Sequence, residues 1–410
     1  MSAAKKSNIL TKITEYSLPL LAGVALALLW ANLWSESYDA FIHAELLPGK
    51  DFHFLVNDIF MVFFFGIAGA EIVRSVLPGG SLNRVKTAVT PLVATVGGIF
   101  GPIAVFFLLN GLIGSPDFSR GWAVPTATDI ALSWLVARLI FGAGHPAVAF
   151  LLLLAVADDA AGLFIIAVFY PDPLFPVEPL WLLLVLAGMG VAFALQKAKV
   201  RSFWPYIMGG GVLAWFGMYN AHLHPALALV FIVPFLPFRP AGKRTPLLTK
   251  PLDGFEHTFK PVVDFGLILF GISNAGVAFS SLSNLTWIVL AALLVGKTGG
   301  IFLLGNLARL FGFPLPAGMR GKELFVTGLV AAIGLTVALF MAEVAYAEPS
   351  LRGAAKMGAL FSFGAALIAL AAGRLLKIKR HQENRNHDGD LSHESPALQE
   401  ENASQTKACS

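Results

Sequence analysis

The sequence has 410 residues, of which 56% are hydrophobic and 13% are charged. Soluble domains carry about a quarter charged residues, so this composition excludes an ordinary soluble protein. The formal net charge of +4 fits the basic loops of a membrane protein better than nucleic acid binding. The single cysteine, Cys409, excludes an intrachain disulfide and gives no indication of redox chemistry.

Apolar stretches long enough to cross a hydrocarbon core of about 30 Å recur along almost the whole chain. In chain order, the predicted membrane spans are 17–34, 54–77, 87–113, 121–140, 146–170, 178–196, 203–219, 222–238, 259–280, 286–311, 323–346 and 354–376. The expected fold class is therefore an all-α polytopic membrane protein of about twelve transmembrane helices.

Three regions are expected: a basic N-terminal segment at 1–16, a membrane domain at 17–376 and a tail at 377–410. The tail has almost no apolar residues and is predicted to be disordered. The stretch 239–250 contains two prolines and a glycine, and we interpret it as a long inner linker rather than as a hinge or regulatory surface.

Most of the 29 Lys and Arg residues fall on one side of the predicted membrane when the N-terminus is placed inside. The outer side would keep Lys50, Arg120, Arg352 and Lys356. This positive-inside pattern predicts that both termini are cytoplasmic.

Ionisable groups inside the spans are functional-site candidates, because each costs roughly 2.5–3.5 kcal/mol to insert. These groups are Asp58, Glu71, Asp129, Asp158, Asp159, Asp264 and Lys297.

Asp158 and Asp159 are neighbours in a long apolar run. Adjacent residues on a helix point about 100° apart, so one can line a water-filled cavity while the other pairs elsewhere. A proton and a small cation can then compete for the same carboxylate oxygens. We interpret the pair as a cation/proton exchange site. Helix-end carboxylates satisfied by caps are the less favoured alternative, because lipid offers no partner.

Lys297 needs a counter-charge at a similar depth, and Asp158, Asp159 or Asp129 could supply it. A purely structural bridge and a role in transport are both open for this lysine. The two roles overlap if the bridge opens when sodium binds.

The fourth predicted span is expected to be interrupted, because Pro125 removes a backbone donor and nearby threonines can bond the freed carbonyls. Gly334 and Thr336 mark a second interruption in the eleventh span. Interrupted helices in corresponding positions of two halves predict an inverted-repeat transporter whose broken helices cross at the midplane. Asp129 would offset the N-terminal helix ends there, and Lys297 the C-terminal ends.

With these residues the chain resembles the bacterial NhaA-type Na+/H+ antiporters over roughly residues 17–376. The matching stretches are VNDIFMVFFF, GWAVPTATDIA, the aspartate pair followed by IIAVFY, ISNAGV, VGKTGGI and IGLT.

The resemblance implies a secondary Na+(Li+)/H+ antiporter rather than an enzyme, with no cofactor, exchanging two protons for one sodium and powered by the proton gradient. Asp159 would be the principal cation and proton carboxylate. Asp158 would share the transient Na+ and pair with Lys297. Thr128 and Asp129 would lie at the crossing of the broken helices. The bacterial inner membrane is the implied location, the lipid bilayer the surroundings and a homodimer a candidate assembly.

The family's pH-responsive cytoplasmic funnel would correspond to Glu71, Arg74, Glu256 and His257. His224 matches another family histidine, although a lone histidine is more often a packed or capping residue.

The sequence also departs from the family at Ser75, which replaces a second glutamate, and at Glu343, which is an added acid. These changes leave open a related exchanger with K+ or other specificity. An intramembrane aspartyl protease is a further alternative, with Asp129 as its second aspartate.

Overall fold

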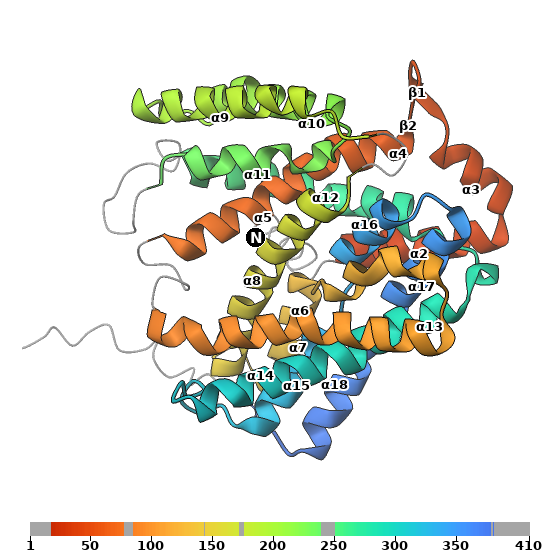
Figure 1. Ribbon diagram of the computed structural model, residues 1–410, viewed down its shortest axis with the longest axis vertical. Helices are drawn as coiled ribbons and strands as arrows, with labels where there is room; N and C mark the ends of the chain where they lie inside the picture. Colours follow the sequence, from red (N-terminus) through yellow and green to blue (C-terminus); the bar gives the residue numbers. More distant parts are fainter. Residues whose placement is uncertain are drawn as a thin grey trace, which may run out of the picture.

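The computed structural model describes residues 18–77, 85–142, 144–171, 176–238, 251–378 and 380. Nearly all of this chain is helical (Figure 1), which confirms the predicted all-α fold class. The N-terminal segment, the 239–250 linker and almost all of the tail lie outside the described residues, so the expectations for them stay predictions.

The α-helices are α2 (Leu18–Leu33), α3 (Ser35–Ile42), α4 (Phe52–Phe54), α5 (Met61–Val76), α6 (Val85–Ile113), α7 (Ile130–Phe141), α8 (Pro146–Phe169), α9 (Leu182–Lys197), α10 (Val212–Asn220), α11 (Ala228–Ile232), α12 (Pro251–Ala275), α13 (Asn284–Ala291), α14 (Thr298–Leu310), α15 (Gly321–Ala331), α16 (Thr336–Ala345), α17 (Pro349–Phe361) and α18 (Gly364–Leu375). Several are joined by π-helical segments: Leu55–Phe60, Tyr206–Gly211 and Ala292–Lys297. The 3₁₀ helices are Pro116–Thr126, Pro179–Trp181, Pro225–Leu227, Val233–Phe235 and Phe279–Ser281.

Helices of membrane-spanning length account for much of the described chain. Six continuous segments are long and apolar enough to cross a membrane: Phe52–Val76, Ala88–Ile113, Pro146–Phe169, Pro179–Lys197, Asn284–Leu310 and Pro349–Leu375. Two bent pairs qualify when each pair is taken as one span: Pro116–Thr126 with Ile130–Phe141, and Gly321–Ala331 with Thr336–Ala345. The chain is thus a multi-pass membrane protein, and the count of twelve crossings stays a prediction.

A short antiparallel hairpin, β1 (Glu45–Leu47) and β2 (Lys50–Asp51), projects between α3 and α4 (Figure 1). Gly49 turns the chain with a φ of 70°, a conformation that costs glycine little and other residues more.

The pairing of α6 with the span that contains Lys297 depends on glycines at the contact. Gly97 and Gly101 of α6 face Gly296 and Gly300, and a Cβ at any of the four would overlap the backbone of the opposite helix. Small residues allow such close backbone approach between membrane helices. This packing brings the buried lysine between α6 and the centre of the molecule.

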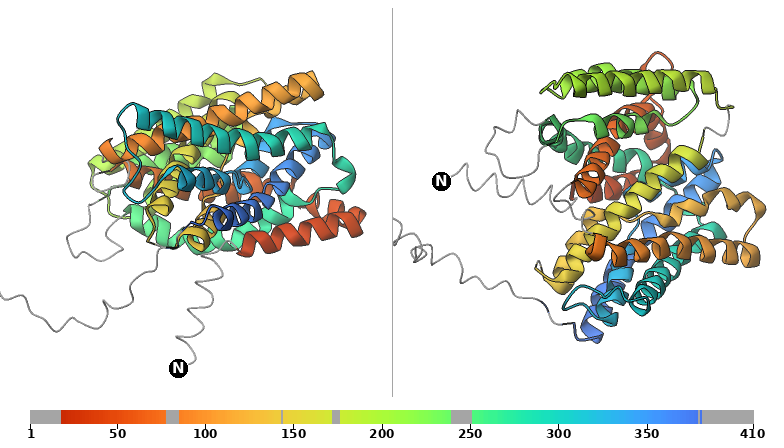
Figure 2. Two further views of the ribbon diagram at one scale, coloured as in Figure 1. Left: turned by 90° about the horizontal axis from the view of Figure 1, so that it is seen from below. Right: turned by 60° about the vertical axis from the view of Figure 1, so that its left-hand side comes forward.

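The aspartate-bearing helix α8 crosses the middle of the molecule obliquely, as Figures 1 and 2 show from different sides. It packs against α5, α6, α7 and α15. A helix surrounded in this way can hold polar side chains away from lipid, which is the arrangement that ionisable groups in a membrane require.

The predicted start of the ninth span is wrong. Helix α12 begins at Pro251 rather than at residue 259, and it ends at Ala275. Its first turns bury Leu252 and Phe255 against the rest of the protein, while acidic and histidine side chains occupy the other face. An amphipathic turn lowers the mean hydropathy, and the span prediction therefore missed it.

Helix α17 begins at Pro349, before the predicted start of the last span at residue 354, and contains both Arg352 and Lys356. Their expected place on the outer side of the membrane stays a prediction. The side chain of Lys356 is only 9% exposed, and Glu343 supplies the counter-charge that a buried ammonium requires.

Candidate functional site

The first helix break lies between the 3₁₀ helix Pro116–Thr126 and α7, whose axes differ by 55°. Pro125 lies at the end of the 3₁₀ helix, and Ala127 is extended with φ −80° and ψ 146°. Asp129 then caps α7, because its side chain accepts a hydrogen bond from the Leu132 amide at 3.0 Å.

The second break separates α15 from α16, which are bent by 51°. Gly334 lies in this break, and a Cβ there would come within 2.7 Å of the Ala127 carbonyl oxygen, so only glycine allows the two breaks to approach. The Ser362 hydroxyl accepts from the Gly334 amide at 3.1 Å and donates to its carbonyl at 2.9 Å. The backbone groups that the break frees are therefore satisfied within the protein, as membrane burial requires.

Hydrogen bonds join the two breaks directly. The Asp129 amide donates to the Ile333 carbonyl at 2.7 Å, and the Thr128 hydroxyl donates to the Ala331 carbonyl at 2.9 Å. The Asp129 carboxylate also accepts from the hydroxyl of Thr336 at 2.7 Å and from its amide at 3.3 Å.

Asp129 thus bonds the first turns of both α7 and α16, where the helix dipoles are positive. Since its oxygens are engaged in this way, the structure gives no support to Asp129 as the second aspartate of a protease.

Lys297 is the counterpart of Asp129 in this arrangement. Its side chain is 0% exposed, and its Nζ donates to the Asp158 carboxylate at 2.7 Å and to the carbonyl oxygen of Thr126. Thr126 is the last residue of the broken 3₁₀ helix, so the ammonium lies at a negative helix end. Lys297 also ends the π-helical segment Ala292–Lys297, a type of helix distortion that is frequent at functional sites.

Asp159 faces a different environment from its neighbour. It lines a cavity of about 540 Å³ that is also bordered by α2, α5, α12 and both helix breaks. Its Oδ1 atom is buried and has no hydrogen-bond partner within the described residues. An unsatisfied carboxylate oxygen at such a place is costly unless a proton or a cation satisfies it.

A cavity that can admit water and an unsatisfied carboxylate therefore meet at Asp159, while Asp158 is held by the lysine. The cavity has five charged lining residues: Glu71, Asp129, Asp159, Lys260 and Asp264. The four carboxylates outnumber the single ammonium, so this surface attracts cations.

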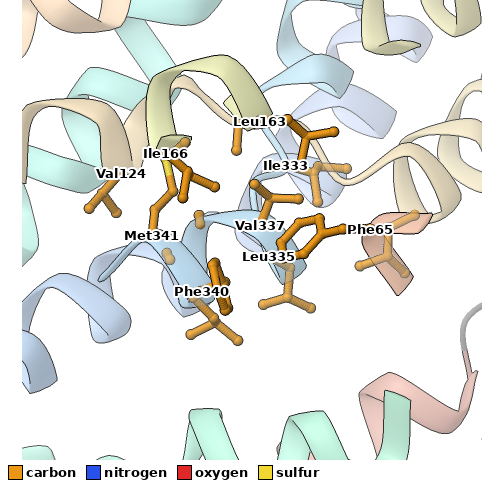
Figure 3. Close-up of a cluster of buried hydrophobic side chains, with 14 of the residues drawn as sticks. Phe65, Val124, Leu163, Ile166, Ile333, Leu335, Val337, Phe340 and Met341 are labelled. Atoms are coloured by element: carbon orange, nitrogen blue, oxygen red, sulfur yellow. The ribbon is translucent and has the colours of Figure 1, made fainter. Parts of the chain in front are cut away.

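Buried apolar side chains separate this cavity from a smaller polar pocket farther along α16. Thr336 and Val337 line the cavity, whereas Glu343 lines the second pocket, whose volume is about 240 Å³. Between them, Phe340 is 2% exposed and packs edge-to-face on Phe65 with ring centroids 5.0 Å apart. Figure 3 shows these rings within a larger apolar cluster from α5, the 3₁₀ helix Pro116–Thr126, α8, the second break and α16. An ion in such a layer would lose its polar ligands, so in this conformation the layer is a barrier between the two spaces.

The smaller pocket contains an ion-pair cluster that sequence reasoning missed. Glu343 pairs with Arg352 at 2.6 Å, with His53 at 3.3 Å and with Lys356. Glu343 stood out in the sequence as an added acid, but nothing in its local pattern indicated that two cations of the next helix would meet it.

The residues expected to sense pH are only partly together. Arg74 pairs with Asp253 at 2.8 Å and with Glu256, so α5 and α12 are joined near their ends. Glu71, one turn before Arg74, lines the Asp159 cavity instead. His257 is exposed.

His224 lies in another place. It lines a polar cavity of about 560 Å³ with Lys50, Asp58 and Glu178, between the hairpin region and α10. The structure does not bring this histidine to the ion pairs of Arg74 with Asp253 and Glu256.

Within the described part of the chain, no three His, Cys, Asp or Glu side chains gather as they would around a resident metal ion. The two aspartates are expected to hold Na+ only in passing, which needs no such closed set of ligands.

The fold and the site together define a polytopic helical membrane protein of the secondary-transporter class, with two broken helices bonded at their interruptions beside buried carboxylates. A family model described as Na+/H+ antiporter 1 matches residues 7–375. The chain belongs to this family, whose members are transporters rather than enzymes.

Similar proteins agree with this assignment. The Na(+)/H(+) antiporter NhaA of Geobacter metallireducens is 59% identical over 373 residues, which cover 90% of this chain and 98% of the relative. The Na(+)/H(+) antiporter NhaA of Desulfitobacterium hafniense is 59% identical over 385 residues, covering 93% and 98%. The sodium proton antiporter MjNhaP1 of Methanocaldococcus jannaschii shares the fold with a TM-score of 0.54 at 16% identity, over 90% of this chain and 95% of that one.

Proposed function

We propose that this protein exchanges Na+ for H+ across the bacterial inner membrane, with Asp159 as the carboxylate for which the two ions compete. The observation that carries the proposal is the buried, unbonded Oδ1 of Asp159 beside a cavity of about 540 Å³. The names of the similar antiporters support the same pair of ions.

In this mechanism a sodium ion enters the cavity, loses part of its water and binds oxygens of Asp159. Asp158 directly precedes Asp159 in α8 and becomes a second ligand when it leaves Lys297. The exchange works because a carboxylate oxygen can hold either a proton or a cation, but not both at once.

Two protons per sodium follow if the ion pair takes part. Asp159 carries one proton, and Lys297 releases the other when Asp158 turns from its ammonium to the cation. Because two positive charges then move against one, the exchange is electrogenic, and the proton gradient drives Na+ or Li+ outward. Thr128 and Asp129 have a positioning role, since they hold the breaks together.

The bias of Lys and Arg toward one side of the predicted spans supports cytoplasmic termini, and Lys260, which lines the Asp159 cavity, is expected on that same side. The membrane domain then covers residues 17–376, followed by a cytoplasmic tail. A homodimer is the proposed assembly.

The test is cation-induced dissipation of a pH gradient in proteoliposomes that contain the purified protein. Na+ and Li+ are expected to dissipate the gradient, and K+ is not. A membrane potential set with valinomycin should change the rate, because the exchange moves net charge. A signal with K+ alone would show another cation specificity, and silence with every cation would refute the proposal.

Glu71 in the cavity and Glu256, which pairs with Arg74, offer a test of pH control. Glu71→Gln and Glu256→Gln are each expected to shift the activating pH while leaving exchange at its new optimum close to that of the wild type. The physical reason is that each change alters the charge beside Arg74 or in the cavity without touching the aspartates. Rates measured across a pH series check this, and an unchanged profile in both variants would remove these residues from pH sensing.

A further inference from the structure

Two charged residues of α12, Lys260 and Asp264, face the same cavity as Asp159. Lys260 Nζ lies 3.5 Å from Asp264 Oδ1. The lysine side chain is 65% exposed and the aspartate side chain only 14%, so Lys260 lies toward the mouth of the cavity and Asp264 deeper inside it. The transport mechanism above uses neither residue.

Helix stability does not explain this pair. An acidic residue stabilises a helix most when it precedes the basic residue by four positions, and here the order is reversed. Pro261 stands between the two residues and removes a backbone donor from the helix. An ion pair with one exposed partner contributes little to folding.

The position of Asp264 instead suits contact with an entering ion. Asp264 shares a face of α12 with Val263 and Leu267, which also line the cavity. Asp264 is the only acidic residue that α12 contributes to the described lining of the cavity. Within the described residues, its one ion-pair partner is the ammonium of Lys260. A cation that enters the cavity therefore meets a carboxylate that is already paired with the ammonium of a lysine, which is carried on a flexible side chain.

We propose that Asp264 is a cation-recruiting carboxylate on the route to Asp159, and that Lys260 competes with the transported cation for it. The proposal rests on the Na+/H+ exchange proposed above. When no cation is present, the ammonium occupies Asp264. An arriving Na+ displaces the ammonium toward the solvent, passes on to Asp159, and the pair closes again. Lys260 and Asp264 thus set the apparent affinity of the cavity for its cation rather than the chemistry of exchange.

The expected results follow from the charges. Asp264→Asn leaves an unpaired ammonium in the entrance, so the KM for Na+ should rise roughly threefold to tenfold with little change in the maximal rate. Lys260→Gln frees the carboxylate and should lower the KM by roughly twofold to fivefold. Both effects should shrink when an impermeant organic salt raises the ionic strength, because part of each is a long-range field. Asp264→Glu, which keeps the charge, should keep the KM near that of the wild type.

The experiment measures KM and maximal rate for Na+ in proteoliposomes with these three variants and the double variant Asp264→Asn/Lys260→Gln. Lys197→Gln is the matched control, since it removes an exposed lysine at the end of α9, outside the cavity. Thermal melting of each variant in detergent detects a merely structural role, which would move stability and leave the KM unchanged.

Two outcomes would overturn the inference while exchange itself stands. One is a KM for Asp264→Asn that matches the wild type, and the other is a KM for Lys260→Gln that rises. Lys260→Gln gives this answer even if Asp264→Asn fails to fold, because Lys260 is mostly exposed. A wild-type protein that moves no Na+ would end both proposals, whereas an active wild type with an inactive Asp159→Asn and a normal Asp264→Asn would end only this one.

Discussion

Asp159→Asn is expected to reduce Na+- and Li+-dependent dissipation of a pH gradient to the level of protein-free liposomes, at every pH at which the wild type is active. The asparagine has nearly the same shape as the aspartate, but it carries no negative charge and takes up no proton in this range. The variant can therefore bind neither the cation nor the proton at this position. The Oδ1 atom accepts no hydrogen bond within the described residues, so the substitution breaks no contact that holds α8 in place.

Folding and binding are measured beside transport in the same variant. Its melting temperature without Na+ should match that of the wild type, and the upward shift that Na+ gives the wild type should be lost. Asp117→Asn is the control, because Asp117 is an exposed acid at the start of a 3₁₀ helix and does not line the cavity. Full exchange by Asp159→Asn would exclude Asp159 as the ion-binding carboxylate.

The sequence was sufficient to find the aspartate pair and the buried lysine, because charges within long apolar runs are rare and costly. Helix geometry also predicted that Asp158 and Asp159 would point apart, and the structure places one on Lys297 and the other at the cavity. The two breaks could be expected from Pro125 and Gly334, since a missing donor and a missing Cβ act on the local backbone.

The contents of the cavity could not be predicted in the same way. Glu71, Lys260 and Asp264 come from α5 and α12, which are far apart in sequence, and only the packing of α12 on α5 and of α5 on α8 brings them to the cavity of Asp159. The sequence marks Glu71 and Asp264 as ionisable groups inside spans, but no local pattern indicates that they share a cavity with Asp159. The same holds for Glu343 and Lys356, which belong to different helices and meet only across the turn between α16 and α17.

Lys297→Ala is expected to destabilise the protein strongly. Lys297 and Asp158 are almost fully buried and 2.7 Å apart, so removal of the lysine leaves a carboxylate without its counter-charge inside the bundle. Breaking a buried pair on one side costs about 3–5 kcal/mol, and the Thr126 carbonyl loses its donor as well. Thermal melting in detergent at a pH well above the acidic range should show a large fall in the melting temperature.

The double variant Asp158→Asn/Lys297→Met separates charge from packing. It removes both charges and keeps most of the side-chain volume, so it should recover much of the stability that Lys297→Ala loses. A melting temperature of Lys297→Ala equal to that of the wild type would show that Asp158 finds another partner or a proton at no cost, and the ion pair would then have no structural role. If the double variant is stable and yet moves no Na+, the pair is retained for exchange rather than for folding, because uncharged side chains fill the same space equally well.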